Sequence, residues 1–271
     1  MSTLNKGTAL ITGASTGIGA VYAERLARRG YDLILVARNR DRLETLAKRI
    51  SNNTGRAVEV LAADLGNKAD LARVETAAKQ DASITLLVNN AGIGASSPLL
   101  DSKIEKMEEL LALNVGALTR LTYAVVAGFV ARGNGTIINI ASAAAIAPEI
   151  LNGVYGGSKA YVLALSHSLQ HELASKGIRI QAVLPGAIAT EFWDTLGLPV
   201  SNLPSQIVMT AENLVDAALA GLDLGEKVTI PSLPQQDEWD KLEAARRAIS
   251  GHLSTTQPAA RYGITQKVSA A

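Results

Sequence analysis

Tyr155 and Lys159 are the side chains whose types and spacing first suggest chemistry. They lie four residues apart in GVYGGSK (153–159), and apolar residues continue downstream at helical spacing. Residues four apart share one face of a helix, so the phenol and the ammonium would stack one turn apart. An ammonium there would lower the pKa of Tyr155 from about 10 and make the phenol a usable proton donor and acceptor. The alternative is a tyrosine and a lysine that merely share a surface helix.

A second chemical motif follows the first expected strand, Thr8–Thr12. The loop at 13–19 reads GASTGIG and leads into a helical pattern. Gly13 would permit a tight turn, and Gly17 and Gly19 would let backbone N–H groups and the helix N-terminus approach a pyrophosphate. Strand, glycine loop and helix in this order favour a dinucleotide site, against a chance glycine triplet in a turn.

The end of the second expected strand, Asp32–Ala37, indicates which dinucleotide would bind. An NAD site carries an acid at that end for the ribose hydroxyls, whereas the acid of this strand lies at its start and Arg38 and Asn39 follow its end. The Arg38 guanidinium would hold a 2′-phosphate, with Ser15 as a weaker second contact, which predicts NADP (NADPH) in preference to NAD. Alternatively, the arginines solvate the start of a helix over 39–53.

The third and fourth expected strands, 57–61 and 84–88, also lead into polar residues. Asp64 would accept a hydrogen bond from an adenine amino group, or it would sit in a turn before the helix at 67–80. The sequence NNAG at 89–92 suits a strand end that turns sharply and presents amides to a cofactor.

The motifs at 12–19, 89–92 and 155–159 together resemble the short-chain dehydrogenase/reductase family over about residues 7–231. The resemblance implies a Rossmann-like, doubly wound α/β fold with a parallel seven-stranded sheet in the order 3-2-1-4-5-6-7 and helices on both faces. The alternation of expected strands and helices agrees independently with an α/β sheet.

One domain is expected over 1–250, with a substrate lid at about 190–210. Residues 237–250 would form a charged helix, and the tail at 251–271 would be partly disordered. The resemblance also implies a homodimer or homotetramer.

Catalytic roles follow for four residues from the same resemblance. Asn114 interrupts an apolar helix expected over 101–131, so its amide is either bonded to nearby backbone or functional; the resemblance implies that it holds a water connected to the motif lysine. Ser142 follows the strand at 135–141, thirteen residues before Tyr155. It would position a substrate carbonyl while Tyr155 donates the proton and the lysine binds the ribose.

Apart from Tyr155 and Lys159 on their helix, the expected cofactor contacts lie at or just after the ends of the strands. The full set comprises Gly13, Ser15, Thr16, Gly17, Ile18, Gly19, Arg38, Asn39, Asp64, Leu65, Asn90, Ala91, Gly92, Tyr155, Lys159, Pro185, Gly186, Ile188 and Thr190. The resemblance implies that the Ile188 backbone meets the nicotinamide carboxamide.

Residues 191–209 include Phe192, Trp193 and several prolines. They would form a mobile lid that excludes water, or a surface loop with stray aromatics. With Ala143–Ala147 and Leu151 they offer an apolar pocket wall, which predicts a hydrophobic ketone or secondary alcohol. The expected activity is that of an NADP(H)-dependent carbonyl reductase or alcohol dehydrogenase. The alternatives are a reductase of carrier-bound oxoacyl groups or steroids, or a redox-inactive NADP-binding sensor or scaffold.

The bulk composition limits the partners. A formal net charge of +1 without a long like-charge run argues against nucleic acid or an anionic membrane surface. The absence of cysteine excludes disulfides and fits a reducing compartment. A short polar start and no apolar run of membrane-spanning length predict a cytoplasmic protein. His167 and His171 are four apart, but with three histidines in the chain a catalytic metal is not expected.

Overall fold

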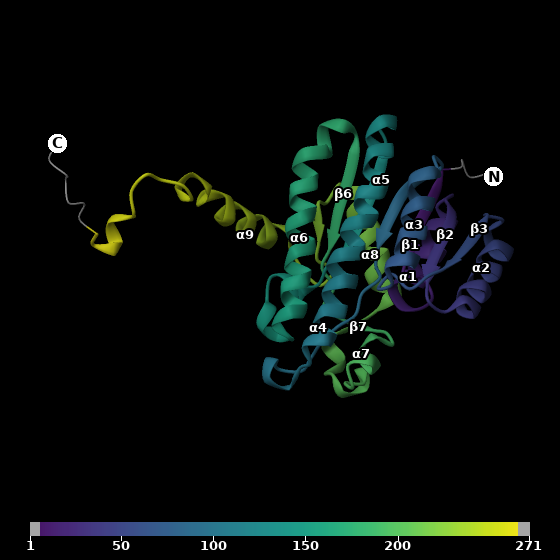
Figure 1. Cartoon of the computed structure of the whole chain (residues 1–271), viewed down its shortest axis with the longest axis horizontal. Coiled ribbons are helices and arrows are strands. Elements are labelled where there is room, and N and C mark those ends of the chain that lie inside the picture. Colours follow the sequence, from purple (N-terminus) through teal and green to yellow (C-terminus); the bar gives the residue numbers. More distant parts are fainter. Residues whose placement is uncertain (1–5, 265–271) are drawn as a thin grey trace. The chain divides into compact units, whose positions relative to one another are not determined.

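The computed structural model of the chain describes residues 6–264, so the part of the predicted tail at 265–271 lies outside the described residues. The chain divides into two compact units after Pro231. The first unit contains every motif singled out from the sequence, and Figure 1 labels its helices and some of its strands.

A seven-stranded parallel sheet forms the centre of the first unit (Figure 1). In spatial order its strands are β3 (Val58–Ala62), β2 (Asp32–Ala37), β1 (Thr8–Thr12), β4 (Ile84–Asn89), β5 (Gly135–Ile140), β6 (Ile178–Val183) and β9 (Val228–Thr229). β9 is the seventh strand of the sheet, so the predicted fold and strand order are confirmed.

Helices cover both faces of the sheet because its strands bury side chains on both sides. Ile11 and Leu33 pack on one face against α1 (Gly17–Arg28), α2 (Arg40–Thr54) and α8 (Ala211–Leu224). Their chain neighbours Leu10 and Ile34 pack on the other face against α3 (Lys68–Gln80), α5 (Leu118–Arg132) and α6 (Gly153–Leu173). Because the strands run parallel, the carboxyl ends of β1, which precedes α1, and of β5, which precedes α6, lie at the same edge of the sheet.

The long helix expected over 101–131 is not continuous. A short 3₁₀ turn at Leu99–Asp101 precedes α4 (Ile104–Leu111), and a π-helical segment, Ala112–Ala117, separates α4 from α5. Asn114 lies in this segment and is 1% exposed. Such π segments inside helices occur frequently at functional sites.

The helical run Ile104–Arg132 has a most apolar window with a mean hydropathy of 1.5, and 44% of that window is buried inside the protein. By length and composition alone this run would be able to cross a membrane, although Asn114 and Arg120 interrupt its apolar residues. Its residues Leu121, Val125 and Phe129 are packed into the core on the same face of the sheet as Leu10 and Ile34. The cytoplasmic location stays a prediction.

The predicted lid lies between two short strands that pair in parallel, β7 (Ala187–Ala189) and β8 (Val208–Thr210). Between them are α7 (Phe192–Thr195) and two 3₁₀ turns at Val200–Asn202 and Ser205–Ile207.

In the second unit, α9 (Gln236–Ala248) matches the predicted charged helix and carries an ion pair between Lys241 and Asp237, four residues apart. The described part of the tail contains 3₁₀ turns at Ser250–His252 and Ala260–Tyr262. The domain boundary expected at residue 250 stays a prediction.

Candidate active site

The start of α6 is fixed by its cap. The Asn152 side chain accepts a hydrogen bond from the Val154 N–H at 2.8 Å and donates one to the Ser97 carbonyl at 2.6 Å. Gly156 is required for space, because a Cβ there would come within 2.9 Å of Pro148. These contacts hold the first turns of a glycine-rich helix against the loops at 95–97 and 148–152.

Tyr155 and Lys159 lie on the buried face of α6, 5% and 7% exposed. The Lys159 Nζ is 5.8 Å from the centroid of the Tyr155 ring and donates a hydrogen bond to the Ile140 carbonyl at 2.9 Å. The predicted stacking of the two side chains is therefore present, and the lysine is anchored at the end of β5.

The predicted direction of the Tyr155 pKa is wrong for this structure. Burial raises the pKa of the phenol, and a hydrogen bond with the Ser142 side chain opposes the rise. Burial also lowers the pKa of Lys159 to about 8. The low-dielectric surroundings of both groups favour their neutral forms, and this effect outweighs the expected influence of the ammonium on the phenol.

Strand β5 brings Ser142 to Tyr155, as the sequence predicted. The Ser142 hydroxyl accepts a hydrogen bond from the Ala144 N–H at 3.1 Å, which begins a short 3₁₀ turn. The Ser142 side chain also acts to lower the pKa of the Tyr155 phenol, so the two hydroxyl groups lie near each other. A carbonyl oxygen placed between these two hydroxyls would meet both, the arrangement that proton transfer to that oxygen requires.

Asn114 is held by backbone. Its Oδ1 accepts from the Ile93 N–H and its Nδ2 donates to the Ile93 carbonyl, both at 2.9 Å. A Cβ on Gly92 would lie 3.0 Å from this Oδ1 and 3.6 Å from the Lys159 Nζ, so Asn114 and Lys159 converge on Gly92. Of the two alternatives for the amide, bonding to nearby backbone is observed, and its role in holding a water stays a prediction.

The glycine loop before α1 has the form of an anion cradle. Gly13 and Gly17 have φ values of +65° and +53°, and a Cβ on Gly19 would lie 2.2 Å from the Gly13 carbonyl oxygen. Throughout α1, which is described from end to end, Thr16 gives no side-chain cap and the first turn carries no acid. The first N–H groups of α1 therefore remain available, and a pyrophosphate fits them.

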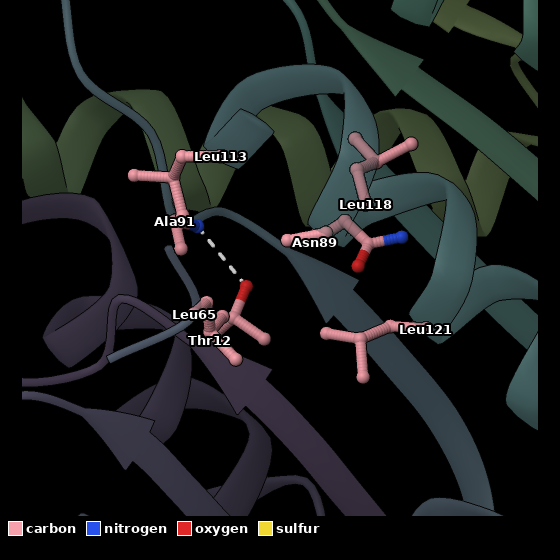
Figure 2. Close-up of a pocket in the computed structure, with 8 residues that line it drawn as sticks. Thr12, Leu65, Asn89, Ala91, Leu113, Leu118 and Leu121 are labelled. Carbon is pink, nitrogen blue, oxygen red and sulfur yellow. Dashed lines mark hydrogen bonds between the residues drawn. The ribbon is translucent and has the colours of Figure 1, made fainter. Parts of the chain in front are cut away.

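Thr12 ties this loop to the end of β4. Its Oγ1 accepts hydrogen bonds from the N–H groups of Asn90 and Ala91, each at 3.0 Å, and Figure 2 shows the bond to Ala91. The Asn90 Nδ2 donates to the carbonyls of Thr12 and Gly13 at 2.9 and 3.1 Å. These two backbone amides hold the glycine loop, and the predicted contact of the 89–92 segment with a cofactor stays a prediction. Thr12 was not among the predicted site residues, although the hydroxyl directly before the first glycine was a usable signal.

Two other predicted contacts serve local structure. The Asn39 Oδ1 caps α2 by accepting from the Arg42 N–H at 3.0 Å. The Asp64 Oδ1 accepts from the Gly66 N–H at 2.9 Å, which is the turn alternative left open by the sequence. Arg38 is exposed at the end of β2.

The predicted contacts after β6 lie beside the glycine loop. A Cβ on Gly17 would come within 3.0 Å of the Thr190 Cγ2. The Pro185 carbonyl accepts from the Ala143 N–H at 2.8 Å, which joins the end of β6 to the Ser142 turn. The Ile188 carbonyl accepts from the Trp193 Nε1 at 2.9 Å.

The sheet edge thus carries a buried Ser–Tyr pair, an adjacent lysine and a dinucleotide cradle. The family model for short chain dehydrogenases matches residues 7–199. The chain belongs to the short-chain dehydrogenase family.

Two solved members of this family resemble the chain over 94% of its length. A short-chain dehydrogenase from Sphingobium yanoikuyae in complex with NADPH is 50% identical, is covered over 100% of its own chain and superposes with a TM-score of 0.91. A bulky-bulky ketone specific alcohol dehydrogenase from Comamonas testosteroni is 44% identical, covered over 98%, with a TM-score of 0.87. A very-long-chain 3-oxoacyl-CoA reductase from Anas platyrhynchos is 36% identical over 80% of this chain and 69% of its own.

The phenol of this short-chain dehydrogenase is surrounded by apolar side chains. Tyr155 packs in a buried cluster with Ala95, Met107, Leu110 and Ala144. Partly buried Ile93, Leu151, Val154 and Phe192 complete the cluster. Ala144, Leu151 and Phe192 were predicted for the pocket wall, whereas the residues from the loop at 93–95 and from α4 were not. No periodicity in the sequence joins α4 to α6, so only the fold brings them together.

Within residues 6–264, no three His, Cys, Asp or Glu side chains gather as ligands for a metal ion. The absence of a metal in this short-chain dehydrogenase stays a prediction.

Proposed function

We propose that this short-chain dehydrogenase is an NADPH-dependent carbonyl reductase that interconverts bulky hydrophobic ketones and their secondary alcohols. The observation that carries the proposal is that Ser142 lies near Tyr155, whose ring is packed in an apolar cluster, at the same sheet edge as the glycine cradle. The solved relatives support it, since one is in complex with NADPH and another is named for bulky-bulky ketones.

The side chains divide the work on a bound ketone. NADPH supplies the hydride that the carbonyl carbon receives. Ser142 donates a hydrogen bond to the carbonyl oxygen and fixes it, and Tyr155 gives its phenolic proton to the oxygen as negative charge develops. Lys159, when protonated, stabilises the phenolate that remains, because its Nζ lies 5.8 Å from the ring centroid.

Preference for NADP over NAD rests on Arg38. It is exposed directly after β2, at the strand end where an NAD site would carry an acid. Within residues 6–264 the Arg38 guanidinium forms no ion pair. At the start of the following helix, Arg40 pairs with Glu44 and Arg42 with Glu191. A 2′-phosphate is the group that such a guanidinium recognises best.

Two other functions compete with the proposed one. Reduction of oxoacyl thioesters draws support from the 3-oxoacyl-CoA reductase relative, and steroid ketones would suit the same apolar cluster. A redox-inactive NADP-binding sensor would not need a serine hydroxyl beside a buried phenol. A homodimer or homotetramer and a cytoplasmic location are part of the proposal and would be tested by light scattering and by cell fractionation.

A substrate panel tests the proposal. The purified protein is mixed with NADPH or NADH and with a diaryl ketone, a small aliphatic ketone, a steroid ketone or an oxoacyl thioester, and the absorbance at the reduced nicotinamide band is followed. The fastest turnover, as kcat/KM, is expected for the diaryl ketone with NADPH. Faster turnover of the thioester would favour the oxoacyl reductase, and NADPH binding without any turnover would favour the sensor.

A further inference from the structure

We propose that the ring of Phe192 is a plug that covers Tyr155 and sits in a slot that exists because residue 94 is glycine. Phe192 and Gly94 together set the size of ketone that the site admits. The inference rests on the proposed function, since it assigns the specificity of the same site. Gly94 has no role in the cofactor cradle or in the Ser142–Tyr155 pair.

Gly94 is required for space and not for backbone conformation. It is not one of the glycines with positive φ in the described chain. A Cβ built on it would lie 2.4 Å from the Phe192 Cζ, 2.9 Å from the Cε2 and 3.0 Å from the Leu196 Cδ2. The tip of the Phe192 ring therefore occupies the volume that any other residue at position 94 would fill.

The same ring covers the phenol. The centroids of the Phe192 and Tyr155 rings are 6.1 Å apart at an interplanar angle of 47°. Tyr155 as a whole is 5% exposed. The carbonyl of a bulky ketone must approach the hydroxyl to about 3 Å, so it reaches that hydroxyl only when the Phe192 ring moves. The other members of the cluster belong to the loop at 93–95, α4, the Ser142 turn, the segment at 148–152 and α6, whereas Phe192 comes from the lid.

The base of the lid is anchored on both sides of the plug. Glu191 pairs with Arg42 on α2 at 2.7 Å, and the indole N–H of Trp193 donates to the Ile188 carbonyl at 2.9 Å. Trp193 also supports the Phe192 ring edge-on, with the ring centroids 5.7 Å apart. Because the side chains of Glu191 and Trp193 are anchored, the site opens when the Phe192 ring itself moves out of the slot.

This geometry distinguishes ketones by size. A bulky ketone must displace the Phe192 ring, which then loses its contacts at Gly94, Leu196 and Tyr155. A small ketone requires less displacement of the ring. Removing the ring would relieve the bulky substrate of that cost, and it would admit water beside Tyr155 during reduction of the small one. Phe192 thus acts as a specificity-determining residue, and Gly94 acts through it as a positioning residue.

A double-mutant cycle with Phe192→Ala and Gly94→Ala tests the plug. The measured quantity is the ratio of kcat/KM for a diaryl ketone to kcat/KM for a small aliphatic ketone, with NADPH. Phe192→Ala should raise the ratio about tenfold, the scale on which a pocket discriminates by one or two carbon groups. Gly94→Ala should change the ratio at least about fivefold when Phe192 is present and less than about twofold in the Phe192→Ala background, because the added methyl acts through the ring.

Gly157→Ala is the matched control. Gly157 is exposed on α6, and within the described chain nothing lies within 4 Å of a Cβ built there, so the ratio should not change. Circular dichroism and NADPH binding establish that each variant is folded. An unchanged ratio in Phe192→Ala, or an effect of Gly94→Ala that persists without the ring, would overturn the plug.

A binding measurement separates failure of the plug from failure of the proposed function. Calorimetry of the diaryl ketone with the NADP⁺-loaded protein needs no turnover, and Phe192→Ala should bind the ketone about tenfold more tightly. If no ketone is reduced by any form while this difference is seen, the reductase assignment fails and the plug stands. Equal affinities would overturn the plug even in an active reductase.

Discussion

The side-chain amide of Asn114 accepts a hydrogen bond from the Ile93 N–H and donates one to the Ile93 carbonyl, each at 2.9 Å. This pairing joins the π-helical segment between α4 and α5 to the loop after β4. It also sets the backbone of Gly92, which approaches both Asn114 and Lys159. The interruption of the helix is thereby coupled to the position of the active-site lysine.

Asn114→Ala should lower the free energy of unfolding by about 2 kcal/mol, because the Ile93 N–H and carbonyl lose their partner. Urea denaturation of the NADPH-free protein measures the change. Thr119→Val is the matched control, since Thr119 lies one turn further along the helix and bonds to the exposed Tyr161 hydroxyl and its own helix. An Asn114→Ala protein as stable as the wild type would show that the pairing contributes nothing.

Tyr155→Phe should retain NADPH binding and lose ketone reduction by about 100-fold or more, because the proton donor is removed while the ring stays packed. Steady-state kinetics with the diaryl ketone and fluorescence titration of NADPH measure the two effects. Tyr161→Phe makes the same change on the same helix, at a side chain 38% exposed, and should leave both quantities unaltered. An active Tyr155→Phe enzyme would remove the assigned acid.

The burial of Lys159 predicts how stability depends on pH. Its pKa is about 8 in the folded protein, below the 10.5 of an exposed lysine. Between these values the unfolded chain binds more protons, so this group makes the protein more stable as the pH rises from about 8 towards 10. Above pH 10 the raised pKa of Tyr155 acts in the opposite direction, because the unfolded phenol ionises first.

Lys159→Met should abolish this dependence. The unfolding free energy of the wild type relative to the variant is expected to rise by about 2 kcal/mol between pH 7 and pH 10. Denaturant titrations at three pH values measure it, and Lys176→Met, at an exposed position after α6, is the control that should follow the wild type. A difference independent of pH would contradict the depressed pKa of Lys159.

Arg38→Asp should shift cofactor preference from NADPH towards NADH, because it replaces the guanidinium for a 2′-phosphate with an acid for the ribose hydroxyls. The ratio of kcat/KM for the two cofactors is expected to fall about 100-fold. Arg28→Asp introduces the same charge change at an exposed position in the last turn of α1, at the end remote from the glycine loop. If both variants shift the ratio equally, net charge alone accounts for the preference.

Local patterns were sufficient for the sheet and for the catalytic pair. Short, mainly apolar runs such as Thr8–Thr12 and Asp32–Ala37 predict buried strands, because a parallel sheet that is covered on both faces buries side chains on both sides of each strand. The four-residue spacing of Tyr155 and Lys159 fixes their common face on any helix, whatever surrounds it. The glycine loop was predictable for the same reason, since the positive φ of Gly13 and Gly17 is a local requirement.

Tertiary structure decided the features that depend on distant parts of the chain. The direction of the Tyr155 pKa follows from its burial among α4, the loop at 93–95 and the lid, which no local spacing encodes. The backbone amides of Asn90 and Ala91 bond to the Thr12 side chain, 78 and 79 residues away. The need for glycine at position 94 arises only in the folded chain, where the Phe192 ring occupies the space that a Cβ would fill. Sequence periodicity records how a segment contacts its own neighbours, whereas desolvation and close packing are set by whichever segments the folded chain brings together.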